Sequence, residues 1–460
     1  FTPTDRLRLT ASAWLSRVAN GSNNQSTVDG LRPGAGTNES TNFEYDLFSG
    51  TAEYEAGAIS IHNSLSHMTY DQDFTTQVPV VSLTAYETDV LTDEFRITSD
   101  FSGPFNFLLG AFYANAESDI AQDIMTNPSQ RDTLESEAWA LFGEAYYAPV
   151  GSRWELTAGL RYFEDERSTA DHLPTTSAFL GLLGFPNPRT ATVDALTPRL
   201  NFAFKANDDA LLYVNVAKGF RSGALQPGIS LISAGLLGVL DQIPPVIQPE
   251  NLWTYETGVK LTSLAGGAID LEAAVYYNDW KDLILILPLA GFPTAYAVNG
   301  PKAESYGLDL LLTARPAKGL TLSIGGNVNE AQYAESRSIF SKGDRIDNVP
   351  SATLNASIDY TRPVRSTLSV FGHLDLQHTE DRGLRTFAPT VPTPIVIDAQ
   401  SDAITVSSLR LGLQSQAWTI ALFADNLFEE DGAVEPISQF NPLGVRLRPR
   451  TFGVNLKVHY

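Results

Sequence analysis

The chain contains no cysteine, and this absence excludes several classes of site. Disulfide scaffolds, thiolate zinc sites, iron–sulfur clusters and cysteine nucleophiles all need thiols. Charge is also scarce, at 18% of residues against roughly 25% in an ordinary globular chain. Only 31 basic residues face 53 acidic ones, which gives a net charge of −22. A nucleic-acid surface needs clustered Lys and Arg, so this balance argues against DNA or RNA as a partner.

Long hydrophobic runs are absent as well. No stretch approaches the ~18–20 apolar residues of a membrane helix, and the longest candidate, Ile229–Leu240, is closed by Asp241. Catalytic signatures are missing too, because no G-x-S-x-G elbow, P-loop or dinucleotide glycine pattern occurs. We therefore expect no enzyme and no bound cofactor. The 43% of hydrophobic residues must follow some other pattern.

That pattern is strict alternation. In Arg153–Asp165, apolar and aromatic side chains occupy every second position and polar or very small ones lie between them. The same alternation recurs in Leu252–Leu261, Ala268–Asn278, Leu320–Asn329 and Thr451–Tyr460. Successive side chains of a strand point to opposite faces, so these segments are predicted to be strands with one apolar face. Helical periodicity is not sustained over a useful length.

The connections between these strands alternate in length. Short segments rich in Gly, Pro, Asn and Asp are expected to form tight turns, for example around Gly57, Gly151 and Gly319. Longer polar or irregular connections are expected at Ala19–Thr41, Asp71–Thr88, Ser118–Thr133, Arg167–Ala195, Gly223–Pro249, Leu283–Pro301, Ala334–Asn348, Thr379–Asp402 and Glu429–Arg446. About 18 strands joined in this way predict an all-β fold, a transmembrane antiparallel up-and-down β-barrel.

The aromatic residues favour a membrane over a soluble β-sandwich. They gather near both ends of the apolar strand faces, at Phe105, Tyr113, Trp154, Tyr162, Trp253, Tyr277, Trp418 and Tyr460. Tyr and Trp prefer the membrane interface, where the ring is apolar and its tip finds hydrogen bonds. Closure into a barrel would leave no strand edge exposed to lipid. The opposite, polar face would line water, and a soluble all-β protein remains the alternative.

Several segments in order resemble the barrel of TonB-dependent outer-membrane receptors. They are Phe95–Ile97 with Asn106–Tyr113, Leu211–Gly223 (LLYVNVAKGFRSG), Tyr255–Lys260 (YETGVK), Ala424–Phe428 (ADNLF) and Arg448–Leu456 (RPRTFGVNL). The final Tyr460, after alternating apolar residues, is similar to the C-terminal signal of Gram-negative barrel assembly. The resemblance covers nearly the whole chain, residues 1–460, and implies a place in the outer membrane, in contact with lipid and lipopolysaccharide.

The resemblance also implies parts that this sequence does not contain. Family members carry an N-terminal plug domain and an energy-coupling segment inside a 22-stranded barrel. With about 18 strands here, we expect a truncated receptor barrel whose coupling to the TonB complex runs through the missing plug. The strand near Leu7–Val18 and the final one at Arg448–Tyr460 should then lack a continuous hydrogen-bonded ladder. The alternative is a passive 18-stranded porin, complete in itself.

Candidate ligand-lining positions lie on the polar phase of the strands, towards the outer end of the lumen: Glu256, Tyr276, Asn278, Asn327, Asn329 and Gln377. The family carries iron–siderophore complexes, cobalamin or glycans, and the sequence does not choose among these ligands. A metal site is not expected, because His62 and His67, like His373 and His378, are five residues apart and should face opposite sides of a strand.

Two kinds of loop segment leave alternatives open. Acidic clusters at Asp71–Asp73, Glu164–Glu166 and Glu429–Asp431 are expected to be solvated loop ends, with a Ca²⁺ or lipopolysaccharide bridge as the alternative. Apolar loop pieces at Phe179–Phe185, Ile229–Leu240 and Leu283–Leu289 are costly in water. They are expected to pack together in a folded loop cap, and contact with an apolar ligand or with lipopolysaccharide is the alternative.

Overall fold

The computed structural model describes residues 1–20, 25–26, 40–76, 82–289, 295–337, 340–388, 395–435, 444–445 and 447–458. Within these ranges, eighteen strands form the main sheet. In chain order they are β1 (Leu7–Asn20), β3 (Ser40–Ala56), β4 (Ile59–Thr76), β5 (Ser82–Ser99), β6 (Phe105–Ile124), β7 (Asn127–Tyr147), β8 (Trp154–Asp171), β9 (Arg189–Asn207), β10 (Ala210–Arg221), β13 (Glu250–Ser263), β14 (Ile269–Lys281), β17 (Ala303–Ala317), β18 (Leu320–Tyr333), β19 (Ala352–Arg365), β20 (Leu368–Thr379), β23 (Ile404–Ser415), β24 (Trp418–Asp425) and β26 (Thr451–Val458).

Each strand of the main sheet pairs antiparallel with the next one along the chain. This is the predicted up-and-down order, and the main sheet has the predicted number of strands. The total is larger because short hairpins lie in the connections: β2 (Gln25–Ser26) with β25 (Gly444–Val445), β11 (Ala224–Leu225) with β12 (Val246–Ile247), β15 (Ile284–Pro288) with β16 (Ala295–Asn299), and β21 (Gly383–Ala388) with β22 (Ile395–Gln400).

Helices occur only as short pieces in the described connections: α1 (Pro174–Leu182), α2 (Gly228–Leu237), α3 (Leu264–Gly267) and the 3₁₀ turn η1 (Leu240–Gln242). None of these helices is long and apolar enough to cross a membrane. The helical periodicity of α1 and α2 escaped the sequence analysis because each covers only two to three turns.

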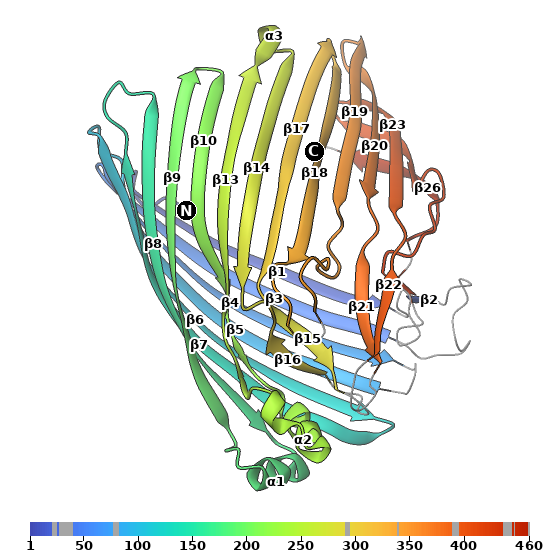
Figure 1. Ribbon diagram of the computed structural model, residues 1–460. Coiled ribbons are helices and arrows are strands. Elements are labelled where there is room, and N and C mark those ends of the chain that lie inside the picture. The colour runs from blue at the N-terminus through green and yellow to red at the C-terminus, as the bar shows by residue number, and fades with distance from the viewer. Residues whose placement is uncertain are drawn as a thin grey trace.

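The two ends of the barrel differ as predicted. The turn at α3 stands at the upper end in Figure 1, whereas α1, α2 and the β15–β16 hairpin lie at the lower end. The short turns around Gly57, Gly151 and Gly319 have a positive φ, which glycine adopts at little cost. All of them join strand pairs at the α3 end, since the strands run up and down in sequence. In membrane barrels the longer loops are the external ones.

Two predicted loops are wrong. The sequence places a long connection at Asp71–Thr88, but β4 continues to Thr76 and β5 begins at Ser82, so the acidic cluster Asp71–Asp73 lies within β4 and is not a loop end. The sequence also places a long connection at Ser118–Thr133, but β6 continues to Ile124 and β7 begins at Asn127. Met125 and Thr126 form a two-residue turn in which both residues have positive φ, as a type I′ hairpin requires. The prediction fails because this hairpin lies beyond the apolar band, where water wets both faces and no apolar alternation is needed.

The strand register confirms the predicted facing of the side chains. On β8, β13 and β14, the charged residues share one face of the sheet and the apolar residues share the other. The charged set is Glu155, Arg161, Glu256, Lys260 and Glu272, and the apolar set is Leu156, Leu160, Val259, Leu271 and Val275. The register also places His62 and His67 on opposite faces of β4, as their spacing predicts.

Aromatic rings form two rows on the apolar face, at the levels predicted for the membrane interfaces. Near the turn end, Tyr147 stacks on Phe105 with ring centroids 4.5 Å apart and meets Trp154 at 5.5 Å. Towards the loop end, Trp139 lies 5.4 Å from Tyr162. Trp154 and Tyr162 bound nine residues of β8, and about nine to eleven residues are what a tilted strand needs to cross the apolar band of a membrane.

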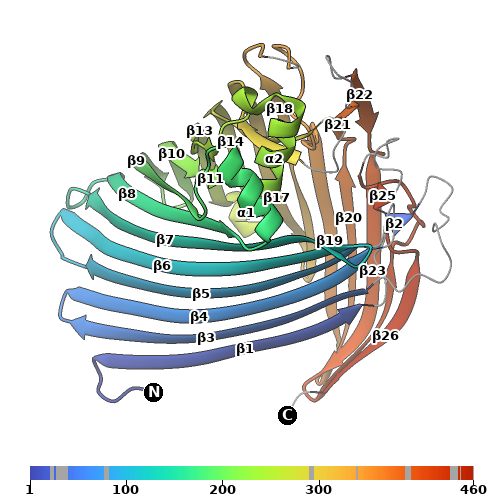
Figure 2. The ribbon, with the colours of Figure 1, turned by 90° about the horizontal axis from the view of Figure 1, so that it is seen from below.

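The sheet has two edges, β1 and β26, which face each other across a seam. Within residues 1–20 and 447–458, no backbone ladder joins the two strands, because β1 pairs with β3 and β26 with β24. On β1, the adjacent Trp14 and Leu15 point to opposite faces and are 68% and 62% exposed. Figure 2 shows both edge strands from the loop end. The small β2–β25 pairing links the connections that follow β1 and precede β26. Tyr460 lies outside the described residues.

Candidate functional site: the lumen wall and the loop cap

The polar face of the sheet is the concave one, as contacts that skip a strand show. Arg199 on β9 approaches Glu144 on β7 to 3.3 Å across β8. Asn327 on β18 donates from Nδ2 to the Tyr276 hydroxyl on β14 at 3.0 Å, across β17. Side chains from strands two apart converge only on the inside of a curved sheet. The polar residues therefore line the lumen, and the apolar residues face outward.

All six predicted ligand-lining residues lie on this concave face, by register. Three of them are joined directly. Asn327 donates to Tyr276, and Asn329 donates from Nδ2 to Asn327 Oδ1 at 2.9 Å and to the Pro350 carbonyl at 2.9 Å. Asn327 also donates to Asp309 Oδ1 at 2.7 Å. The structure thus brings Tyr276, Asn327 and Asn329 together in one hydrogen-bonded row.

The other three predicted residues stand apart from this row. Glu256 is directly opposite Tyr276 in the ladder and borders a shallow cavity of about 270 Å³, which it shares with Tyr213, Lys260, Glu272 and Asp309. Asn278 accepts from Thr254 Oγ1 at 2.7 Å and donates to Ser305 Oγ at 3.0 Å, so its amide is used within the wall. Gln377 lies further round the barrel on β20 and is exposed.

A glycine sets the position of the Tyr276 ring. A Cβ atom at Gly307 would lie 2.6 Å from the Tyr276 hydroxyl oxygen, closer than real side chains approach. The ring therefore lies over bare backbone on the neighbouring strand. This keeps the tyrosine flat against the wall and aims its hydroxyl at Asn327 on the strand beyond.

The wall chemistry is that of hydrogen bonding and charge pairing. Lys260 Nζ lies 3.0 Å from Glu272 Oε2, and His373 Nδ1 lies 2.7 Å from Asp359 Oδ1. Across the described part of the chain, no group of three or more His, Asp or Glu side chains could hold a metal ion. Such a wall can hold water in the lumen and offer hydrogen bonds to a polar solute.

The apolar loop segments pack on one another only in part as predicted, because Leu283, Leu285 and Leu287 belong to a second cluster with Tyr333 and Phe340. Leu180 from α1, Leu231 and Ile232 from α2, and Leu289 after β15 form one buried cluster, with Leu183, Phe185, Leu237 and Leu240 packed against it. We call this body, formed by the described residues of three connections at 172–188, 222–249, 282–289 and 295–302, the loop cap. Viewed from the loop end, α1 and α2 lie inside the curve of the sheet, near β8–β10 (Figure 2).

Polar contacts bind the loop cap together. Gln226 binds the backbone of Ala297 with both ends of its amide, since Nε2 donates to the carbonyl and Oε1 accepts from the amide N–H at 3.1 Å. Ser230 Oγ donates to the Ala295 carbonyl at 2.7 Å. The residues before and within α2 are thus joined to the β15–β16 hairpin, although about 70 residues separate them.

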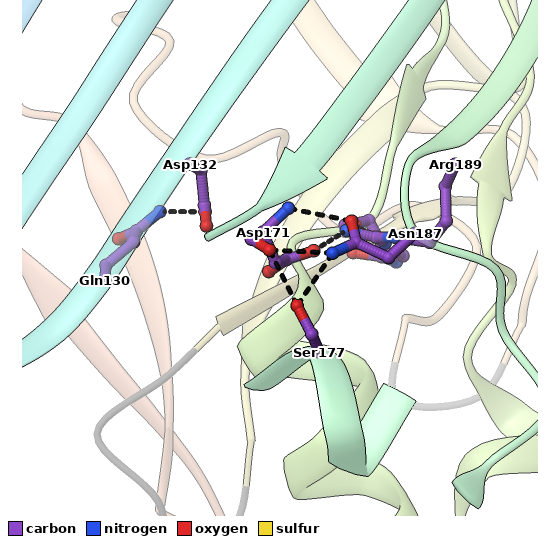
Figure 3. A network of polar contacts seen from close by, with 7 residues as sticks. Gln130, Asp132, Asp171, Ser177, Asn187 and Arg189 are labelled. Atoms are coloured by element: carbon purple, nitrogen blue, oxygen red, sulfur yellow. Dashed lines mark hydrogen bonds and ion pairs between the residues drawn. The ribbon is translucent and has the colours of Figure 1, made fainter. Parts of the chain in front are cut away.

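A buried charged network fastens the loop cap to the wall (Figure 3). Arg189, at the start of β9, donates from Nη2 to Asp171 Oδ2 at 2.8 Å and from Nη1 to the Gln226 carbonyl at 2.5 Å. Asp171 is opposite Asp132 in the β7–β8 ladder. Gln130 Nε2 donates to Asp132 at 2.7 Å. Burial and the neighbouring Asp171 carboxylate raise the pKa of Asp132 to about 6.

Sequence reasoning missed this network. Asp171 and Arg189 are 18 residues apart in an irregular connection, and no spacing rule links them. The acidic cluster Glu164–Glu166 was also misread as a solvated loop end. It lies within β8, where Asp165 is buried and accepts from Ser136 Oγ at 2.7 Å and Ser222 Oγ at 3.0 Å.

The family of TonB-dependent receptor-like β-barrels matches residues 2–427. Among solved structures, the ferric yersiniabactin uptake receptor FyuA from Yersinia pestis is similar with a TM-score of 0.76 and 18% identity, covering 99% of this chain and 68% of that one. The ferric citrate transporter FecA gives 0.74 and 14% identity, covering 99% and 68%. BauA, the ferric preacinetobactin receptor of Acinetobacter baumannii, gives 0.72 and 13%, covering 98% and 70%.

An outward apolar band between aromatic rows, a polar concave wall and a loop cap define a membrane transport barrel. The chain belongs to the TonB-dependent receptor β-barrel family. Family membership makes it a transport-receptor barrel and not an enzyme, in a family of Gram-negative outer-membrane proteins.

Proposed function

We propose that this barrel serves a receptor that takes up an iron chelate through the outer membrane, driven by the TonB complex. Support comes from the similar solved structures, which are a ferric yersiniabactin uptake receptor, a ferric citrate transporter and a ferric preacinetobactin receptor. Cobalamin and glycans are the other ligand classes that the family resemblance implies.

The observation that carries the proposal is the loop cap beside a wet lumen. Three connections fold into one body with its own apolar core, joined to the wall through Arg189 and Asp171. Such a body gives the barrel a folded surface at its mouth on which a ligand can be bound before it enters the lumen. The ligand would meet the loop cap first and then the lumen face, where Glu256, Tyr276, Asn278, Asn327, Asn329 and Gln377 offer polar contacts.

Energy coupling is proposed to act through a plug in the lumen, which the TonB complex would pull. The unjoined edges β1 and β26 fit a barrel that has further strands in this seam, because exposed backbone groups in hydrocarbon cost several kcal/mol each. Outward-facing residues above the aromatic rows would then meet lipopolysaccharide.

Uptake of radioactive iron chelates by cells that express the intact gene tests the function. We expect accumulation under iron limitation that stops when a protonophore collapses the proton-motive force or when the tonB gene is deleted. A matched strain that carries the variant Arg189→Met should bind less chelate while its barrel still reaches the membrane. Uptake that persists with the protonophore would instead indicate the passive porin.

A further inference from the structure

One lumen arginine is held by aromatic rings instead of by acids. Arg161 on β8 lies directly opposite Phe142 on β7. Its Cζ atom is 5.4 Å from the centre of the Phe142 ring and 5.5 Å from that of Phe112 on β6. These distances fall within cation–π range. A phenyl ring offers no acceptor for the in-plane N–H groups, so the guanidinium fork stays available.

Neighbouring lumen arginines are committed to carboxylates. Arg96 lies 3.0 Å from Glu94, and Arg199 lies 3.3 Å from Glu144. Among the described residues, by contrast, no carboxylate comes within ion-pair distance of Arg161, and no hydrogen bond is donated by its side chain. Glu94, opposite Phe112 in the ladder, acts on Arg161 only at longer range and is itself paired with Arg96. Arg161 is half-buried in the wall, so it lacks an acidic partner although it does not simply extend into water.

The setting of Arg161 is built by glycines. A Cβ atom at Gly110 would overlap the Phe142 ring, so the ring lies over bare backbone and is fixed beneath the guanidinium. At Gly159, a Cβ atom would come within 3.0 Å of the Glu144 side chain. The space left open is a cavity of about 370 Å³ whose charged lining is Arg161, Arg199, Lys218 and Glu144. Glu144 is paired with Arg199, so Arg161 is not neutralised by it.

We propose that Arg161 is the anchor of an anion site in the lumen wall, and that the site binds a carboxylate group. A guanidinium fork matches the two oxygens of a carboxylate and binds them with parallel hydrogen bonds. In a chain of net charge −22, an unpaired arginine at mid-wall is a local positive spot for an anion. The carboxylate is supplied either by a small dissolved anion or by an acidic polypeptide segment seated in the lumen.

Calorimetric titration of the purified chain in zwitterionic detergent at low ionic strength tests the site, with citrate and a tetraglutamate peptide as probes. We expect binding to weaken at least tenfold in Arg161→Gln. Arg161→Lys should fall between the two, because it keeps the charge and loses the fork. Two controls should stay within about twofold of wild type. Arg315→Gln removes one charge at a distant turn, and the double variant Arg8→Gln with Glu53→Gln removes a lumen-face arginine several strands away at constant net charge.

The two probes separate the sources of the carboxylate. Arg161-dependent binding of citrate alone would indicate a small anion, and Arg161-dependent binding of the peptide would indicate a polypeptide segment. The proposal is overturned if neither probe binds, if Arg161→Gln and Arg161→Lys both bind like wild type, or if the double control loses as much as Arg161→Gln. Heat-modifiable gel mobility reports whether each variant is folded. Iron uptake can succeed or fail independently of this result.

Discussion

Arg189 on β9 and Asp171 on β8 form an ion pair at 2.8 Å, and the two side chains are only 4% and 3% exposed. The pair joins the loop cap to the wall, because Arg189 also holds the Gln226 carbonyl. Removing one partner from a buried pair leaves an uncompensated charge and costs about 3–5 kcal/mol. We therefore expect Arg189→Met to open the loop cap, measured as faster hydrogen exchange in α1 and α2. The exposed pair of Arg8 and Glu53 is the control. Arg8→Gln should change the free energy of opening of the backbone around this pair, measured by hydrogen exchange, by less than about 1 kcal/mol.

The same network predicts an unusual response to acid. The pKa of Asp132 is raised to about 6 in the folded chain from an ordinary value of 3.8. The folded state thus holds this proton more tightly, so protonation between pH 6 and pH 4 stabilises the loop cap and raising the pH removes that stabilisation. The chain lacks cysteine, so spin labels can be attached at two introduced cysteines, Leu182→Cys on α1 and Leu141→Cys on β7. The distance between the two labels then reports how the loop cap lies relative to the barrel wall. We expect a narrower distribution at pH 5 than at pH 7.

Asp132→Asn should give the narrow distribution at both pH values. Asp119→Asn, on the neighbouring strand, is the control and should keep the pH response of the wild type. A wild-type distribution that broadens on acidification would contradict the assignment.

Facing can be tested by a cysteine scan of β14. We expect cysteines at Glu272 and Ala274 to react with a charged, water-soluble thiol reagent from the lumen. Cysteines at Leu271 and Val275 should stay unmodified, because a lipid-facing thiol rarely ionises and meets no charged reagent. The reverse pattern would mean a one-residue slip, which turns every side chain over.

Some glycines of the lumen wall lie beneath aromatic rings, and replacing them should lower the stability of the barrel more than replacing other glycines. A Cβ at Gly307 would lie 2.5 Å from the Val328 carbonyl oxygen and 2.6 Å from the Tyr276 hydroxyl. Gly307→Ala should therefore strain the neighbouring strand, displace Tyr276 and break its hydrogen bond with Asn327, and overpacking of this kind costs about 1–3 kcal/mol. The control is Gly50→Ala on β3, where an added Cβ meets no atom within 4 Å. Denaturant titration in micelles, followed by gel mobility, measures both. Equal stability of the two variants would mean that the position of Tyr276 does not depend on the missing side chain at Gly307.

The seam between β1 and β26 predicts where disulfides can form. Cysteines at Ile420 and Leu456 are register partners on β24 and β26 and should cross-link under mild oxidation. Cysteines at Leu15 and Leu456 should not, since no ladder joins β1 to β26 in the described residues. Efficient cross-linking of the second pair would indicate a closed ring.

Much of the barrel could be read from alternation, because each spanning strand meets lipid on one side and water on the other. The segment from Trp154 to Tyr162 shows this directly, with its aromatic residues at the two interfaces. Beyond the membrane that contrast disappears, which explains why the β6–β7 hairpin was taken for a loop. Helix α2 was hidden for a related reason, since nearly all of it is apolar and it has no polar stripe.

The candidate site was predicted only in part. Alternation places Tyr276, Asn327 and Asn329 on the polar face, but it cannot show that β14 and β18 converge across β17. That contact depends on the curvature of the sheet and on the bare backbone of Gly307. The Asp171–Arg189 pair depends on how an irregular connection folds, which no periodicity records.

The loop cap also constrains how such a receptor can change over evolutionary time. Gln226 ties the second connection to the third, and Arg189 ties the second to the wall behind the first. If one connection were exchanged between two receptors, Gln226 or Arg189 would face a backbone of different shape and would lose its hydrogen bonds. We therefore expect a change of ligand preference to need all three connections exchanged together, or small substitutions on their outer surface, where Leu182, Leu236 and Ile286 lie exposed.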